Sequence, residues 1–146
     1  MNLNSEAGNR LLGFGIKPSL QRIAIMEYLM EHATHPTADV IFNDLYPSIP
    51  TLSKTTVYNT LKLLEEQGAI QAINIDDKNV RYDGDISRHA HFKCKQCGSV
   101  LDIPFKDNIA FEIRDYGDIL LTELQVYYKG YCKQCKYVFI QNVNHS

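Results

Sequence analysis

Apolar residues in the first half of the chain recur at the three- and four-residue intervals of amphipathic helices. This pattern predicts a short first helix within residues 3–16. Three further helices are expected to begin after Ser19, Thr37 and Ser53, whose hydroxyls can accept hydrogen bonds from the first turn of a helix. The fourth helix is expected to run to about Gln67, just before a glycine that can end it.

Two short segments of alternating apolar and polar residues follow, and they predict a β-hairpin. Its strands are expected over residues 69–75 and 79–83, with residues 76–78 at the tip. Short helices followed by a hairpin is the order of elements in a winged helix-turn-helix. The pattern therefore indicates a winged-helix DNA-binding domain over residues 1–83.

A polar segment that contains a glycine, residues 84–91, is expected to be a hinge. After it the pattern predicts a second, smaller α/β domain over residues 92–146, so the fold class is α+β. Around and within this domain we expect a hairpin over 91–103, a helix over 105–116 and a long strand over 119–131 that 136–141 continues briefly.

Composition is that of an ordinary soluble globular protein, with 45% hydrophobic residues, 22% charged residues and a formal charge of −2. We find no secretory leader and no apolar run near the roughly 20 residues of a membrane span, so a cytoplasmic location is expected. Residues 1–83 hold 7 Lys and Arg against 10 Asp and Glu. A DNA-binding face must therefore come from the position of its basic residues and not from their number.

The fourth predicted helix offers a polar face suited to reading DNA. Lysine binds phosphates, asparagine can make two hydrogen bonds to an adenine edge, and tyrosine or threonine can contact thymine methyls or phosphates. A solvated helix face has a similar composition, and it is the winged-helix order of elements that favours DNA. The residues on this face are Lys54, Thr55, Tyr58, Asn59 and Lys62.

Four cysteines form two CxxC pairs, Cys94 with Cys97 and Cys132 with Cys135, separated by 34 residues. Each CxxC places two sulfurs on one side of a tight turn, and two such turns brought together suit tetrahedral Zn²⁺. A disulfide framework or unpaired core cysteines are the alternatives, and a reducing cytoplasm disfavours the disulfides. The spacing predicts a closed, structural zinc site.

Histidines and aspartates supply a second, harder set of donors. His89 and His91 would point to the same side of an extended segment, because side chains alternate with period two along a strand. Nitrogen and oxygen donors of this kind suit Fe²⁺, Mn²⁺ or Zn²⁺. A site that used the whole set would tie the DNA-binding domain to the second domain across the hinge. The set is His35, Asp83, His89, His91 and Asp102.

Several motifs occur in a fixed order along the chain. They are Gly15-x-Lys17-x-Ser19-x-Gln21-Arg22, His35-Pro36-Thr37-Ala38, Thr56-Val57-Tyr58-Asn59-x-Leu61, Arg81-Tyr82-Asp83, His89-x-His91 and the two CxxC pairs. This ordered set resembles the ferric uptake regulator (Fur) family of metal-dependent repressors over nearly the whole chain.

The resemblance implies a winged helix joined by a hinge to an α/β dimerisation domain, and a homodimer that binds a palindromic operator in double-stranded DNA. It implies that the four cysteines hold structural Zn²⁺ and that the histidine and aspartate set holds a regulatory Fe²⁺ or Mn²⁺. Lys17 and Arg22, in the first motif, join the face of the fourth helix as expected DNA contacts.

Within the family, the residues of this chain are most similar to those of the peroxide-responsive (PerR) branch. Iron-sensing members often carry glutamate where this chain has Asp83 and Asp102, and arginine where it has Asn59. In the peroxide-responsive branch bound Fe²⁺ reacts with hydrogen peroxide and oxidises a ligand histidine, which releases the repressor from DNA. The matching histidines here are His35 and His89, and Mn²⁺ would give a peroxide-insensitive repressor.

Two alternatives remain open. One is an iron- or zinc-responsive repressor of the same family without peroxide chemistry. The other is a zinc hydrolase that uses the histidine and aspartate set to hold a catalytic metal. The sequence shows no general base near this set and no pocket-forming loops, so we expect a regulator and not an enzyme.

Overall fold

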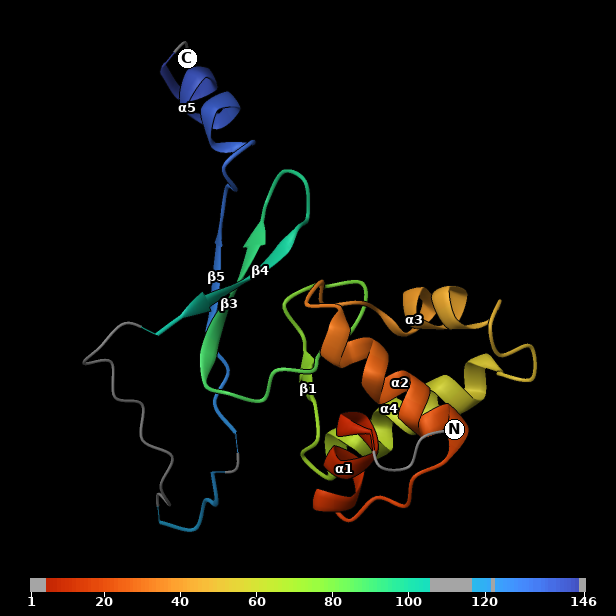
Figure 1. The fold of residues 1–146 in the computed structure, drawn as a ribbon. Helices are drawn as coiled ribbons and strands as arrows, with labels where there is room; N and C mark the ends of the chain where they lie inside the picture. Colours follow the sequence, from red (N-terminus) through yellow and green to blue (C-terminus); the bar gives the residue numbers. More distant parts are fainter. Residues whose placement is uncertain (1–4, 106–116, 122, 145–146) are drawn as a thin grey trace. The chain divides into compact units, whose positions relative to one another are not determined.

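The computed structural model describes residues 5–105, 117–121 and 123–144. The chain divides into two compact units, residues 1–87 and 88–146. In Figure 1 the first unit is mainly helical, and the second is built on a small sheet followed by a helix. The expected α+β fold is confirmed, with helices and a hairpin followed by a small second sheet.

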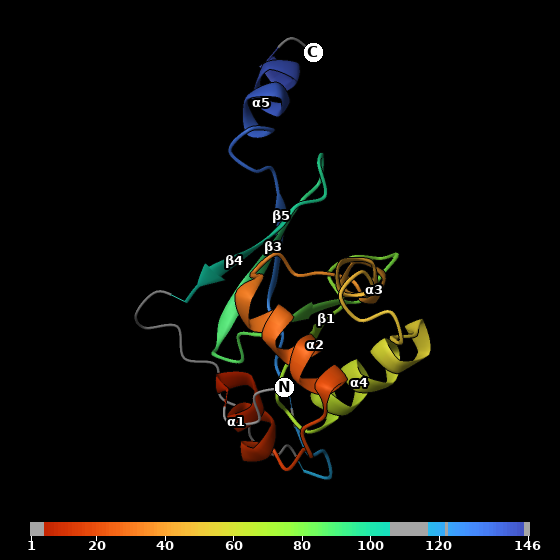
Figure 2. The same cartoon turned by 45° about the vertical axis from the view of Figure 1, so that its right-hand side comes forward.

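The first unit contains four helices followed by a two-stranded antiparallel hairpin. α2 and α3 lie against α4, as Figures 1 and 2 both show. The hairpin pairs Gln71 with Asp83 and Ile73 with Arg81. The elements are α1 (Glu6–Gly13), α2 (Leu20–Glu31), α3 (Ala38–Leu45), α4 (Lys54–Glu66), β1 (Gln71–Ile73) and β2 (Arg81–Asp83).

The predicted helix starts are confirmed by their caps. The Ser19 hydroxyl accepts a hydrogen bond from the Arg22 N–H at 3.2 Å. In the same way the Thr37 hydroxyl accepts from the Val40 N–H, and the Ser53 hydroxyl accepts from the Thr56 N–H. Each cap satisfies a backbone N–H that has no partner within its own helix. These caps fix where α2, α3 and α4 begin.

One apolar core holds these helices together. Leu11 of α1, Ile25 and Met26 of α2, Ile41 of α3 and Leu61 of α4 are fully buried in it. The outward sides of α2 to α4 are mainly polar, although Leu20 and Val40 are exposed there. Among the described residues, no helix is long and apolar enough to cross a membrane.

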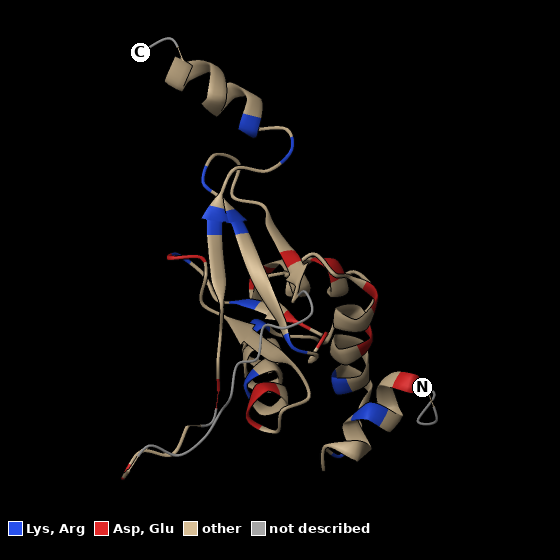
Figure 3. Cartoon of the chain, turned by 90° about the vertical axis from the view of Figure 1, so that its left-hand side faces the viewer, with Lys and Arg blue, Asp and Glu red and all other residues tan. Residues whose placement is uncertain are grey.

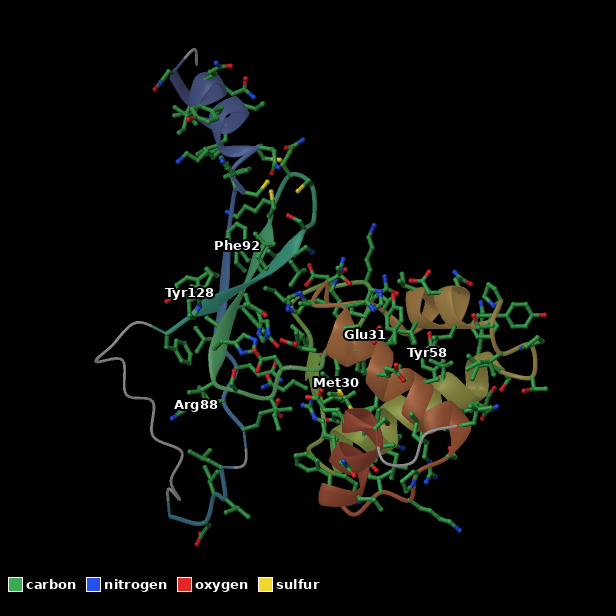
Figure 4. All side chains as sticks on the ribbon, viewed as in Figure 1. Met30, Glu31, Tyr58, Arg88, Phe92 and Tyr128 are labelled. Atoms are coloured by element: carbon green, nitrogen blue, oxygen red, sulfur yellow. The ribbon has the colours of Figure 1, made fainter. Side chains whose placement is uncertain are left out.

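The second unit contains a three-stranded sheet in the order β4-β3-β5. β3 pairs antiparallel with β4 and parallel with β5, and Phe92 of β3 lies opposite Tyr128 of β5 in that register (Figure 4). The elements are β3 (His89–Cys94), β4 (Val100–Pro104), β5 (Tyr127–Gly130) and α5 (Lys136–Asn144). β3 thus begins inside the segment 84–91.

The expected long strand over residues 119–131 is wrong. Among the described residues of this range, the one strand is β5, with a single bridge residue at Ile119 before it. The parallel ladder joins Tyr127–Gly130 to His91–Cys94 of β3. The expected helix over residues 105–116 lies almost wholly outside the described residues.

The expected brief extension over residues 136–141 is also wrong, because these residues begin α5. The Lys136 N–H donates to the Cys132 carbonyl at 2.8 Å and the Phe139 N–H to the Cys135 carbonyl at 3.2 Å. The second CxxC turn therefore starts a helix, which the apolar run alone did not indicate.

Gly84 allows a close backbone approach at the end of the hairpin. A Cβ atom at this position would lie 2.6 Å from the Leu29 carbonyl oxygen of α2. We expect Gly84→Ala to lower the free energy of unfolding of the first unit by about 1–3 kcal/mol, because the backbone must shift to relieve the overlap. Urea unfolding followed by circular dichroism measures this loss.

Gly13→Ala is the matched control. A Cβ there meets nothing within 4 Å, and Gly13 is the last residue of α1, where alanine is a better helix former. We expect its stability to stay equal to that of the natural chain or rise slightly. Equal stability of the two alanine variants would contradict the packing assigned to Gly84.

Candidate metal centres and nucleic-acid interface

The four cysteines come together at one end of the second sheet. Cys94 ends β3, Cys97 lies in the turn to β4, and Cys132 and Cys135 follow β5. All four Sγ atoms lie within 4.8 Å of one another, and the Sγ atoms of Cys97 and Cys132 are 3.7 Å apart. A zinc–sulfur bond of about 2.3 Å gives a tetrahedron with sulfur–sulfur edges of about 3.8 Å. The cluster therefore fits tetrahedral Zn²⁺.

A disulfide needs a sulfur–sulfur distance of about 2.05 Å, and all four thiols are free. The disulfide alternative therefore has no support in the arrangement of the four cysteines.

Hydrogen bonds around the cluster favour thiolate at its first pair. The backbone N–H of Cys97, assisted by that of Cys132, lowers the pKa of Cys94 to about 6. The hydroxyl and backbone N–H of Ser99 lower the pKa of Cys97, and the Ser99 Oγ lies 3.2 Å from its sulfur. The Cys132 side chain hydrogen-bonds to Cys135 and, with burial, raises its pKa to about 12. A dication that binds four thiolates must displace the proton of the Cys135 thiol.

The first unit places one imidazole beside one carboxylate. His35 precedes α3, Asp83 ends β2, and both side chains are almost fully buried. The His35 Nε2 lies 3.4 Å from the Asp83 Oδ2. Two residues from sequence-distant segments are thus held together as a pair that could donate to a metal.

The second unit places two imidazoles around one carboxylate. In the β3–β4 ladder His91 lies opposite Asp102, and His89 points to the same face as period-two alternation predicts. The Asp102 Oδ1 is 3.1 Å from the His89 Nε2 and 3.5 Å from the His91 Nε2. Their nitrogen and oxygen donors suit a first-row divalent metal better than a soft one.

The polar face predicted on the fourth helix is exposed on α4. Its five residues are all exposed, whereas Val57, Leu61 and Leu64 are fully buried. The Tyr58 hydroxyl donates to the Asp39 carboxylate of α3 at 3.4 Å (Figure 4). In Figure 3 the first unit carries both Lys and Arg and Asp and Glu, so this face is not part of a uniformly basic surface.

An open hollow of about 440 Å³ lies between α4 and the start of α2. Among its lining residues are Lys17, Arg22 and Asn59, three of the expected DNA contacts. A second hollow, of about 380 Å³, lies between α4 and the hairpin and is lined by Tyr58, Asn59 and Lys62. The sequence did not predict that Asn74 and Tyr82 of the hairpin region also line this hollow, because the packing of α4 on the hairpin is non-local.

Comparisons with known proteins agree with these features. The profile of the ferric uptake regulator family matches residues 14–126. The chain belongs to this family. Its members are DNA-binding transcriptional regulators that respond to metals and form dimers, so the expectation of a regulator and not an enzyme is confirmed.

Individual Fur-family proteins match over most of the chain. The "Peroxide-responsive repressor PerR" of Staphylococcus aureus (strain Mu50) is 33% identical over 127 residues, covering 84% of each chain. The Campylobacter jejuni peroxide stress regulator superposes with a TM-score of 0.65 at 28% identity, covering 92% of this chain and 100% of that one. The Helicobacter pylori ferric uptake regulator superposes with a TM-score of 0.67 at 20% identity, covering 93% and 97%, which supports the fold.

The cysteine cluster generates a direct test. We expect Cys97→Ser to lower bound zinc from one ion per chain to nearly none and to lower the unfolding temperature, because three sulfurs cannot complete the tetrahedron. Zinc is measured by elemental analysis of protein purified without added metal. Ser99→Ala is the matched control: its hydroxyl touches the Cys97 sulfur without being a ligand, so zinc should be retained. A full zinc ion in Cys97→Ser would refute the four-cysteine site.

Proposed function

We propose that this Fur-family chain is a homodimeric, metal-activated transcriptional repressor that senses hydrogen peroxide. Its regulatory metal would be Fe²⁺ or Mn²⁺, and its structural metal Zn²⁺ at the four cysteines. The observation that carries the proposal is the donor set, in which imidazoles and carboxylates lie 3.1 to 3.5 Å apart within each unit. The proposed regulatory ligands are His35, Asp83, His89, His91 and Asp102.

Both carboxylates of this set are aspartates, which matches the peroxide-responsive branch. The relatives named as peroxide-responsive repressors are also the ones with 32–33% identity to this chain. Bound Fe²⁺ would catalyse the redox chemistry. Overall, hydrogen peroxide would give one oxygen atom to a C–H bond of a ligand imidazole, His35 or His89, and its other oxygen would leave as water. The protein's own part is to hold these imidazoles beside carboxylates, so that the donors are preorganised.

Metal binding would act on DNA affinity by a population shift. Ligands contributed by both units favour the arrangement of the units in which all five can bind one ion. If that arrangement is the one that fits the operator, metal and DNA each raise the affinity for the other. Loss of one imidazole by oxidation would reverse the shift.

Peroxide sensing can be tested with one protein and two metals. We load the protein anaerobically with Fe²⁺ or Mn²⁺, add hydrogen peroxide, and measure operator binding together with the masses of the peptides that contain His35 and His89. With Fe²⁺ we expect one added oxygen atom and loss of DNA binding. With Mn²⁺ we expect neither. Unchanged mass and binding with Fe²⁺ would leave a repressor that responds to iron without peroxide chemistry.

The expected DNA contacts predict two kinds of variant. Asn59→Ala should weaken binding mainly to operators with the preferred base at one position, by about 1–3 kcal/mol, because its amide can read a base edge. Lys62→Gln should weaken binding about equally on all sequences and reduce the salt dependence by about one phosphate contact. Fluorescence anisotropy on DNA selected from a random pool, over a range of salt, separates the two.

Lys129→Gln is the charge-matched control, because this exposed lysine lies on β5 of the other unit. Lys129→Gln should change neither the affinity for DNA nor the dependence of that affinity on salt concentration. If Asn59→Ala weakened all sequences equally, α4 would not be the element that reads the operator bases.

A further inference from the structure

The Arg81 side chain connects two parts of the first unit that the proposed function uses separately. On one side its Nη1 donates to the His35 carbonyl oxygen at 3.2 Å. On the other, its Nε and Nη2 each lie 3.3 Å from the Asp76 Oδ2 at the hairpin tip. One planar guanidinium therefore contacts the backbone of a proposed metal ligand and the carboxylate that shapes the tip.

His35 has a backbone conformation that needs such support. Its φ is +54°, and among the described residues it is the one non-glycine residue with positive φ. The left-handed region is unfavourable for a residue with a side chain and persists where surrounding contacts impose it. The contact from Arg81 to the His35 carbonyl is one of those constraints.

The residues after His35 are tied to the same strand. The Tyr82 N–H donates to the Pro36 carbonyl at 3.0 Å, and Thr37 forms an isolated antiparallel bridge with Arg81. The segment from His35 to Thr37 therefore lies along β2, the strand that ends in Asp83. This pairing is what brings the His35 Nε2 to within 3.4 Å of the Asp83 Oδ2.

The other end of the link organises the hairpin tip. The Asp76 Oδ1 accepts from the Lys78 N–H at 3.0 Å, so one carboxylate holds both the turn and Arg81. The side chains of Arg81 and Asp76 are 23% and 14% exposed. A pair so shielded from solvent is screened less than one on the open surface.

We propose that Arg81 is a positioning residue that couples the His35 and Asp83 half of the regulatory metal site to the tip of the DNA-binding hairpin. The inference rests on the proposed function, in which His35 binds the regulatory metal. Arg81 keeps His35 in its left-handed conformation. A change in the position of His35 would therefore move the Arg81 guanidinium and, with it, the Asp76 carboxylate. By linkage, part of the increase in metal affinity that operator DNA produces depends on this guanidinium.

Mn²⁺ is the probe for the test, because it binds without oxidising the protein in the proposed scheme. Its affinity is measured by competition with a chelating dye, with and without operator DNA, for the natural protein and for each variant. We expect Arg81→Gln to bind Mn²⁺ about tenfold more weakly without DNA, the effect of losing one hydrogen bond from a charged donor. Zinc per chain should stay at one in this variant.

Asp76→Asn separates the two ends of the link. It leaves the contact from Arg81 to the His35 carbonyl in place but removes the charge at the tip. We therefore expect Mn²⁺ affinity without DNA to stay within about twofold of the natural protein, while the gain in affinity on adding operator falls severalfold. Asp77→Asn is the matched control, because it makes the same substitution at the neighbouring exposed residue of the tip, and both values should be unchanged.

A spectroscopic readout distinguishes positioning from a general loss of stability. Replacing Mn²⁺ with Co²⁺ gives visible absorption bands that report the ligand geometry. Arg81→Gln should shift these bands toward those of His35→Ala, while Arg81→Lys, which can still donate to the His35 carbonyl, should restore the natural spectrum. A variant that was merely less stable would keep the natural spectrum at low temperature.

The outcomes separate this inference from the proposed function. If His35→Ala bound Mn²⁺ as tightly as the natural protein, the proposed regulatory site itself would be wrong. If His35→Ala lost Mn²⁺ but Arg81→Gln kept natural affinity and spectrum, the site would stand and the positioning role would be refuted. Loss of DNA affinity alone in Arg81→Gln would likewise refute it, because Arg81 would then act as a phosphate contact.

Discussion

The pairing of β3 with its two neighbours is the constraint on which the second unit depends. Its parallel ladder with β5 sets Cys94 beside Gly130, so that the chain returning after β5 brings the Cys132 N–H to 3.4 Å from the Cys94 sulfur. Its antiparallel ladder with β4 sets His91 opposite Asp102. A single six-residue strand thus assembles one set of donors at its end and another along its length. Slipping either ladder by one residue would turn a ligand to the wrong face.

In the first unit β2 positions side chains as β3 does in the second. Three consecutive residues carry three functions: Arg81 contacts the His35 carbonyl, the Tyr82 N–H bonds Pro36, and Asp83 lies beside the His35 imidazole. The hairpin expected to supply the wing is therefore also the scaffold of the His35 and Asp83 pair. A change at either the hairpin or the pair would act on the same short strand, so the coupling proposed for Arg81 needs no long pathway.

Local signals in the sequence predicted local structure well. The hydroxyl caps at Ser19, Thr37 and Ser53 lie where the helices begin, and the CxxC spacing identified four residues that the fold brings together. The failures came where a distant partner decides the outcome. One exception is α5, which starts locally from the Cys132 and Cys135 carbonyls. β5, by contrast, is formed by pairing with the distant β3, and the contacts of Arg81 span 46 residues to His35. The periodicity of apolar residues along the chain does not identify distant partners, although Arg81 does lie in one of the motifs shared with the Fur family.

The alternation of side chains along β3 also explains how two chemically different sets of possible metal donors can share one strand. His89 and His91 are two residues apart and face one side, whereas Cys94, three residues beyond His91, faces the other side in a regular strand. Thiolate sulfur would compete strongly for zinc and soft metals, while imidazole and carboxylate leave room for iron or manganese. Alternation therefore keeps the soft donor out of the harder set by geometry, without any residue dedicated to excluding it. Moving Cys94 by one position along the strand would place a thiolate on the imidazole face, and the harder set would then gain a ligand that prefers zinc.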